Sequence, residues 1–355
     1  MDNNRFIRYF SKNRNVVPRI KVILMFIGLI FVTLVFIESL LTFIINIKEQ
    51  QITEDYEFRY NPYTAFSSTL RDTKNHCENH NENIEIHVYG GSTTWGSRTE
   101  YNETYSSYLS KILCDKGFNV NIKNYGQLSY TNTQEFIKFI LGVKNGNVPN
   151  IVIFYDGVND MPSEPGLQFE QKTKDVVRDI LDNSRFLPSV HRLLSNFFKT
   201  IGFKEKSEID KHTNYFQIFD RHKLQYNSED EKQLLIVSNY INNVEFIKSL
   251  EKIYNFTSLF YWQPHLGTKQ TYSEEEEKSL NMKYIKRDLE SYEKSYNLTI
   301  NIIREHKYVS DLTNLFDNVS ETIYHDDCHK NIIGNQILAQ RMARDIIAII
   351  NNASE

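Results

Sequence analysis

Five short strand-like runs, each separated from the next by a stretch with helical periodicity, constrain the fold of this chain more than any other feature. The runs cover 84–89, 119–123, 150–155, 258–262 and 308–312. The helical stretches cover 104–115, 133–143, 229–253, 273–306 and 331–350. Strands that alternate with helices form a parallel sheet covered on both faces. We therefore expect an α/β protein, a three-layer α/β/α sandwich with a roughly five-stranded parallel sheet.

The first of these strands runs directly into a turn that ends in a candidate nucleophile, Ser92. Two glycines precede this serine and permit a tight turn. A serine at the carboxyl end of a parallel strand presents its hydroxyl at the edge where such sheets bind ligands. Because glycine and serine also form ordinary turns, the hypothesis depends on partners elsewhere in the chain.

Three further motifs follow strands and supply such partners. They are Asn124-Tyr125-Gly126, Gly157-Val158-Asn159-Asp160 and Asp326-Asp327-Cys328-His329. Strand ends on one side of a parallel sheet converge, so these motifs can form one site with Ser92. A serine needs a base that takes its proton, and the imidazole of His329 suits that task near neutral pH. Asp326, three residues earlier, can accept the other ring N–H and stabilise the imidazolium.

These motifs resemble the four sequence blocks of the SGNH/GDSL hydrolase family: Gly-x-Ser, Gly, Gly-x-Asn-Asp and Asp-x-x-His. The resemblance covers 84–350 and is weakest between 161 and 235. It implies an SGNH-hydrolase, flavodoxin-like fold and a catalytic triad of Ser92, Asp326 and His329, with no cofactor and no metal. It also implies an oxyanion hole made by the backbone N–H groups of Ser92 and Gly126 and the side-chain amide of Asn159.

The chain departs from this family, and from its alternatives, at identifiable residues. Gly91 stands where the Gly-Asp-Ser form has an aspartate, and Gly126 is followed by Gln127 rather than by a second glycine. The order Ser, Asp, His is also that of α/β-hydrolases, but Thr94 occupies the last position of their Gly-x-Ser-x-Gly turn. A phosphate-binding loop at 91–96 would need a lysine where Ser97 stands.

A metal site is the other alternative near the C-terminus. His325, Cys328 and His329 could be ligands, but no second ligand cluster in the sequence completes a tetrahedral set. Of the three cysteines, Cys77 and Cys114 can form one disulfide in an extracytoplasmic domain, which leaves Cys328 beside the proposed base.

The N-terminal region carries a second strong signal, an apolar run at 22–47 that contains one charge, Glu38. About 20 apolar residues suffice to span a bilayer as a helix. The preceding tail, 1–21, carries six cations against one acid, which predicts a cytoplasmic N-terminus and an extracytoplasmic remainder. A cleaved signal peptide would have a shorter apolar core and a small-residue cleavage site. We expect a single-pass anchor, then a linker at 48–83.

The remaining sequence bounds the substrate. A net charge of −4, with no basic stripe beyond the tail, argues against nucleic acid as a partner. A long segment with weak pattern, 161–229, predicts an inserted helical lid. Gln263, His265 and Gln127 are candidates for the pocket wall.

The resemblance and the anchor together predict an esterase that removes O-acyl groups, most simply acetyl, from an extracytoplasmic glycan. An O-acyltransferase with the same site, or a non-catalytic glycan-binding protein that retains the fold, are the alternatives.

Overall fold

The computed structural model describes residues 58–77, 84–163 and 226–353, together with short helical pieces between 25 and 37. These helical pieces belong to a separate unit, in which the Thr33 hydroxyl donates to the Leu29 carbonyl (2.8 Å). Within the described residues, no helix combines the length and the apolar character needed to cross a membrane. The predicted tail at 1–21, most of the predicted anchor at 22–47, and most of the predicted lid lie outside the described residues.

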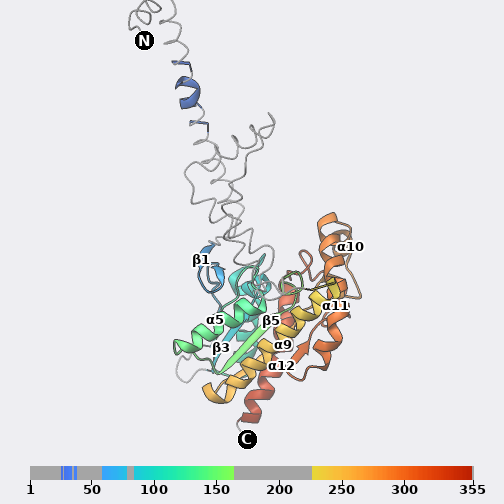
Figure 1. The fold of residues 1–355 in the computed structure, drawn as a ribbon. Coiled ribbons are helices and arrows are strands. Elements are labelled where there is room, and N and C mark those ends of the chain that lie inside the picture. The colour runs from blue at the N-terminus through green and yellow to red at the C-terminus, as the bar shows by residue number, and fades with distance from the viewer. Residues whose placement is uncertain are drawn as a thin grey trace, which may run out of the picture. The chain divides into compact units, whose positions relative to one another are not determined.

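A five-stranded parallel sheet forms the centre of the second unit, as predicted (Figure 1). Its strands, in spatial order, are β4 (Val120–Asn124), β3 (Ile84–Gly90), β5 (Ile151–Asp156), β6 (Thr257–Trp262) and β7 (Val309–Asp311). The register pairs Gly90 with Tyr155 and Tyr155 with Tyr261, so the carboxyl ends of β3, β5 and β6 lie at one level. The strand order reverses between β3 and β5, and that is where such sheets bind ligands.

Helices cover both faces of the sheet and complete the three layers. They are α3 (Ser92–Trp95), α4 (Tyr105–Asp115), α5 (Asn132–Lys144), α9 (Glu229–Tyr254), α10 (Glu274–Leu280), α11 (Lys283–Glu305) and α12 (Ile332–Ala353). Buried side chains of α4 and α12 pack with Ile86 and Val88 on one face. Those of α5, α9 and α11 pack with Tyr89 and Phe154 on the other. Alternate residues of the central strands β3 and β5 thus enter two different cores, which explains the continuous apolar run at 151–155.

The predicted helix at 273–306 is wrong as a single element, because the structure divides it into α10 and α11. Asn281 ends α10, and its side-chain amide donates to the Glu277 carbonyl (2.9 Å). Met282 then adopts an extended conformation, with φ −72° and ψ 128°, and precedes the first residue of α11. Asparagine competes for backbone hydrogen bonds in this way at helix ends.

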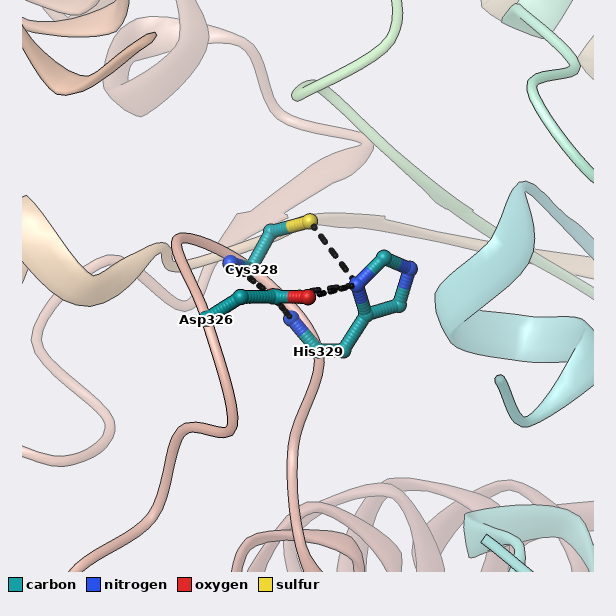
Figure 2. Close-up of side chains that lie close together, drawn as sticks. All are labelled: Asp326, Cys328 and His329. Carbon is teal, nitrogen blue, oxygen red and sulfur yellow. Dashed lines mark hydrogen bonds and ion pairs between the residues drawn. The ribbon is translucent and has the colours of Figure 1, made fainter. Parts of the chain in front are cut away.

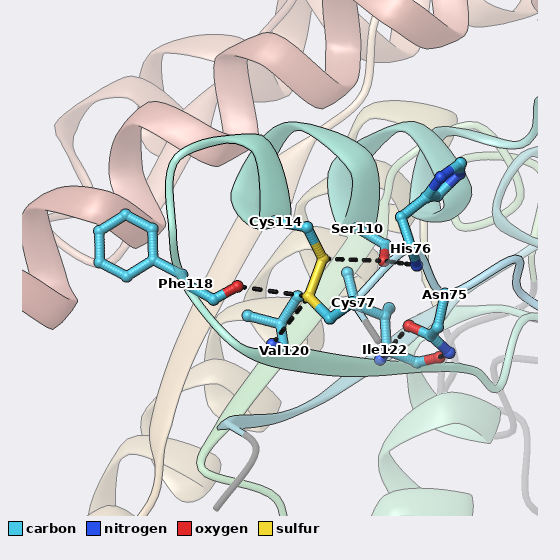
Figure 3. Close-up of a disulfide and its surroundings, with 8 residues drawn as sticks. All are labelled: Asn75, His76, Cys77, Ser110, Cys114, Phe118, Val120 and Ile122. Atoms are coloured by element: carbon cyan, nitrogen blue, oxygen red, sulfur yellow. Dashed lines mark hydrogen bonds between the residues drawn. A yellow bond between two sulfur atoms is a disulfide. The ribbon is translucent and has the colours of Figure 1, made fainter. Parts of the chain in front are cut away.

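The predicted linker contains ordered structure that the sequence pattern did not indicate. Residues 58–77, which we call the strap, begin with an antiparallel hairpin of β1 (Arg59–Asn61) and β2 (Ala65–Ser67). The strap then runs along the outer edge of β4, where Asn75 exchanges two hydrogen bonds with the backbone of Ile122 (2.8 and 3.0 Å) (Figure 3). The disulfide between Cys77 and Cys114 fixes its end to α4. The strap therefore covers an edge strand that would otherwise expose unpaired backbone groups.

Candidate active site

Ser92, His329 and Asp326 form a continuous hydrogen-bonded chain. The Nε2 atom of His329 lies 2.8 Å from the Ser92 hydroxyl, and Nδ1 lies 2.8 and 3.0 Å from the two carboxylate oxygens of Asp326. Asp326 also accepts the backbone N–H groups of Cys328 (3.1 Å) and His329 (2.8 Å). Burial alone would raise the pKa of Asp326, but these hydrogen bonds and the imidazole hold the pKa below its usual range. The carboxylate therefore stays ionised and orients the imidazole.

Local structure at the start of α3 positions the nucleophile. Ser92 is the first residue of this short helix, so its backbone N–H has no acceptor inside the helix. A Cβ atom at Gly91 would lie 2.2 Å from the amide nitrogen of Asn159, so the glycine leaves room for that amide. The amide of Asn159 thus reaches the backbone beside Ser92, while one of its hydrogens is donated to the carbonyl of Tyr130 (2.9 Å). Its second hydrogen can serve an oxyanion.

Gly126 does not fill its predicted role, and we correct that assignment. Its backbone N–H already donates to the side-chain oxygen of Asn124 (2.9 Å). A Cβ atom at Gly126 would lie 2.4 Å from the backbone nitrogen of Trp95, so the glycine permits close packing of the turn against α3. The sequence shows a glycine after a strand but not which N–H group faces the nucleophile.

The segment that follows, 127–131, contains a residue that sequence reasoning missed. We call this segment the oxyanion turn. Ser129 has φ 57°, in the left-handed region that few residues other than glycine adopt. Within the described chain, the N–H of Ser129 donates to no acceptor. Its neighbour Tyr130 accepts the Asn159 amide. A serine in a conformation typical of glycine was not detectable from its residue type.

The three predicted pocket-wall residues have different surroundings. Gln263 contacts the nucleophile helix, where its side-chain oxygen accepts the Thr93 hydroxyl (3.1 Å). Gln127 is fully buried and joins the Ser68 N–H (2.7 Å) to the carbonyl of Gly126 (2.9 Å), so its role is internal.

His265 is also internal, contrary to the prediction. Its ring lies against Tyr292 and Tyr296, and its Nδ1 accepts the N–H of Gly267 (3.1 Å). Burial lowers the pKa of His265 to about 3, so the imidazole is neutral. The predictions for Gln127 and His265 were therefore wrong, because position at a strand end does not fix side-chain direction.

Buried carboxylates tie the first turn of α5 to the turn after β5. Asp160 accepts the N–H groups of Gly157 (3.1 Å) and Asn132 (2.9 Å), and Asp156 accepts the Asn132 amide (2.9 Å). Glu135 is buried beside them; burial, followed by the charge of Asp156, raises the pKa of Glu135 well above its usual range. A protonated Glu135 can donate to the Asp156 oxygen that otherwise has no partner among the described residues.

A second group of charged side chains supports the segment that carries Asp326 and His329, residues 321–330, which we call the catalytic loop. Lys269 and Glu276 form a fully buried ion pair. Glu276 also accepts the N–H groups of Ile323 (2.8 Å) and Tyr324 (3.2 Å), and Lys269 donates to the Glu321 carbonyl (2.8 Å). The catalytic loop is thus fixed to α10 by charge-assisted bonds.

Cys328 lies beside Asp326 and His329 (Figure 2), and these three residues have possible metal-ligand atoms within 4.8 Å of one another. The Sγ atom is 3.7 Å from Nδ1 of His329, while Asp326 is closer, at 2.8 Å. Nδ1 is hydrogen-bonded to the carboxylate and Nε2 to Ser92, so both ring nitrogens have the hydrogen-bond partners of a Ser-His-Asp triad.

Several solved structures resemble the fold. An acetyl xylan esterase is 12% identical, the match covering 74% of this chain and 100% of that protein, with a TM-score of 0.40. A protein of the lipolytic G-D-S-L family from Desulfitobacterium hafniense is 10% identical over 74% of this chain and 99% of its own, with a TM-score of 0.38. A family 3 carbohydrate esterase from Clostridium thermocellum is 14% identical over 77% and 100%, also with a TM-score of 0.38. No protein-family model and no curated protein sequence matches the chain.

Proposed function

We propose that this chain is a serine esterase of the SGNH type. The observation that carries the proposal is the unbroken hydrogen-bonded chain from the Ser92 hydroxyl through His329 to Asp326. Such a chain activates a hydroxyl for attack on an acyl carbonyl. The amide of Asn159 beside the start of α3 supplies a donor where negative charge develops on the carbonyl oxygen.

The reaction would proceed in two steps with the same base. As the Ser92 oxygen bonds to the acyl carbon, its proton passes to Nε2 of His329 and then to the departing alcohol oxygen. Water next attacks the acyl-enzyme and gives a proton to the same Nε2, which returns it to the Ser92 oxygen as the acid departs. Asp326 stabilises the imidazolium in both steps through its contact with Nδ1.

The oxyanion hole in this proposal has three donors. Two are those predicted from the sequence, the backbone N–H of Ser92 and the side-chain amide of Asn159. The N–H of Ser129 takes the place that was predicted for Gly126, because it has no acceptor among the described residues and adjoins Tyr130, which holds Asn159. Each donor of this kind stabilises the transition state by roughly 3 kcal/mol.

The substrate class that we propose is an O-acylated, most simply O-acetylated, glycan outside the cytoplasm. Two features support this location: the apolar run at 22–47 after a basic tail, and the disulfide between Cys77 and Cys114. Disulfides persist in oxidising compartments, and glycans whose hydroxyls are acylated would supply ester substrates there. A reporter fused after Glu355 tests the orientation, because it should be active only if it folds outside the cytoplasm. A signal from a cytoplasmic reporter would contradict the proposed location.

Labelling with a fluorophosphonate tests the esterase mechanism directly. The Ser92 oxygen should form a bond to phosphorus while fluoride leaves with the serine proton, and intact-protein mass should rise by one adduct. Ser92→Ala should remain unlabelled and should not hydrolyse p-nitrophenyl acetate. Ser97→Ala is the matched control, because it removes a nearby hydroxyl outside the triad, and it should behave as the parent chain. Labelling of Ser92→Ala at the parent rate would refute the mechanism.

A further inference from the structure

The strap, residues 58–77, is bonded to the oxyanion turn by buried hydrogen bonds. The Ser68 N–H donates to the side chain of Gln127 (2.7 Å), and the Ser68 hydroxyl accepts the N–H of Leu128 (3.3 Å). The hydroxyl of Tyr130 lies 2.7 Å from the Thr64 hydroxyl and within hydrogen-bond distance of the Phe66 carbonyl. The strap is thus joined to the turn at Gln127, Leu128 and Tyr130.

Tyr130 connects the strap to the candidate active site through its two ends. Its hydroxyl is held by Thr64, while its carbonyl accepts the Asn159 amide (2.9 Å). The preceding residue, Ser129, has φ 57°, a conformation that surrounding structure must maintain. Tyr130 is fully buried, and its ring packs edge-on against Phe66 with 5.4 Å between centroids. A displacement of Tyr130 would therefore move both Ser129 and Asn159.

The strap also contacts the helix that carries the nucleophile. The carbonyl of Thr69 accepts the indole N–H of Trp95 (2.8 Å), and the guanidinium of Arg71 lies 4.4 Å from the centre of the Trp95 ring. Trp95 is the last residue of α3, which Ser92 begins. One continuous segment thus bonds to two of the elements that carry the proposed oxyanion donors, α3 and the oxyanion turn, although it belongs to neither the sheet nor the catalytic motifs.

We propose that the strap sets the spacing between α3 and the oxyanion turn, and that Thr64 in the strap and Tyr130 in the turn are positioning residues for the esterase reaction. The inference rests on the proposed function. It assigns a role in turnover to a segment that precedes the first strand of the sheet. Oxyanion donors must be held to within a fraction of an ångström, and a 1 Å displacement costs about 100-fold in rate.

Tyr130→Phe in the full chain tests this inference, because it removes one hydroxyl and keeps the ring packing. We expect kcat for p-nitrophenyl acetate to fall about tenfold or more with KM nearly unchanged, since the donors act mainly in the transition state. Thr64→Val should have the same effect, the double variant should be little worse than either, and Thr64→Ser should retain activity. Tyr63→Phe, in the exposed part of the same hairpin, is the matched control.

The outcomes separate this inference from the proposed function. The positioning role alone would be overturned if the parent chain is labelled at Ser92 and the Tyr130→Phe and Thr64→Val variants keep the kcat of the parent chain. A rise in KM without a fall in kcat would also overturn it, because the strap would then bind substrate. Parent chain that is not labelled by the fluorophosphonate would instead overturn the esterase mechanism. If Tyr130→Phe is too unstable to purify, the kcat of Thr64→Val is compared with the kcat of Thr64→Ser instead.

Discussion

The buried ion pair between Lys269 and Glu276 provides the sharpest stability test of the catalytic loop. Both side chains are fully buried. Glu276 also accepts the N–H groups of Ile323 (2.8 Å), Tyr324 (3.2 Å) and Ser273 (3.1 Å), so its charge is compensated by one cation and three backbone donors. Lys269→Met removes the cation and leaves the carboxylate buried. Removal of one partner from such a pair costs about 3–5 kcal/mol.

A double-mutant cycle distinguishes ionic coupling from simple loss of packing. Lys269→Met should lower the unfolding temperature by roughly 10 °C, given the usual conversion for a domain of this size. Glu276→Gln should cost a similar amount, because it leaves the ammonium buried. The double variant should be less destabilised than the sum of the two singles by more than about 1 kcal/mol, since it holds no unpaired buried charge.

Urea unfolding followed by tryptophan fluorescence measures these free energies. Both tryptophans of the chain, Trp95 and Trp262, are buried in the unit that contains the pair, so the signal reports on its unfolding. Lys278→Met is the control, because Lys278 is exposed on the same helix and should matter little. Strictly additive losses in the cycle would refute the argument, as would a stable Lys269→Met variant with parent unfolding behaviour.

Three further results are expected from the site. Asn159→Ala should lower kcat about 100-fold with little change in KM, measured by steady-state hydrolysis of p-nitrophenyl acetate; a change in KM alone would reassign Asn159 to substrate binding. Ser92→Ala and His329→Ala should each abolish turnover, and the double variant should be hardly worse, whereas additive losses would show that the two do not act together. Burial raises the pKa of Asp156 to about 6 and that of Glu135 well above 4.5. The folded state therefore holds protons that the unfolded state releases. As a result, the free energy of unfolding should fall as pH rises through these pKa values. Glu135→Gln, whose amide can donate to Asp156, should lose less unfolding temperature between about pH 5 and about pH 9 than the parent chain.

The sheet was predictable in large part because its central strand, β5, is buried along its whole length and on both faces. Residues such as Ile153 and Phe154 enter opposite cores, so β5 appears in the sequence as an uninterrupted apolar run with clear ends. Each of the five strands begins and ends within one residue of its predicted limits. The hydrogen-bonded arrangement of Ser92, Asp326 and His329 was predictable for a related reason: a serine triad requires these residue types, and the motifs follow strands of one sheet.

The strap and the oxyanion turn were not predictable, because their structure depends on contacts between distant segments. The two strands of the strap have three residues each, too few to show alternation. They are stabilised by side chains such as Gln134, which donates to the Thr64 carbonyl (2.8 Å) from 70 positions away. The same limit applies to Gly126. Its N–H bonds to Asn124 rather than facing Ser92, and only the fold of the turn determines that choice.

The contacts around Gly91 give a physical reason for the glycine that replaces the aspartate of the Gly-Asp-Ser form. The carbonyl of Tyr130 holds the Asn159 amide, and that amide lies 2.2 Å from where a Cβ atom on residue 91 would be. An aspartate at this position, as in the Gly-Asp-Ser form, would therefore overlap the proposed oxyanion donor unless the turn moved. The glycine, the asparagine and the tyrosine are thus mutually dependent, and the strap that holds the tyrosine belongs to the same set. The residue before Ser92 is small here because the amide of Asn159 reaches it from the side.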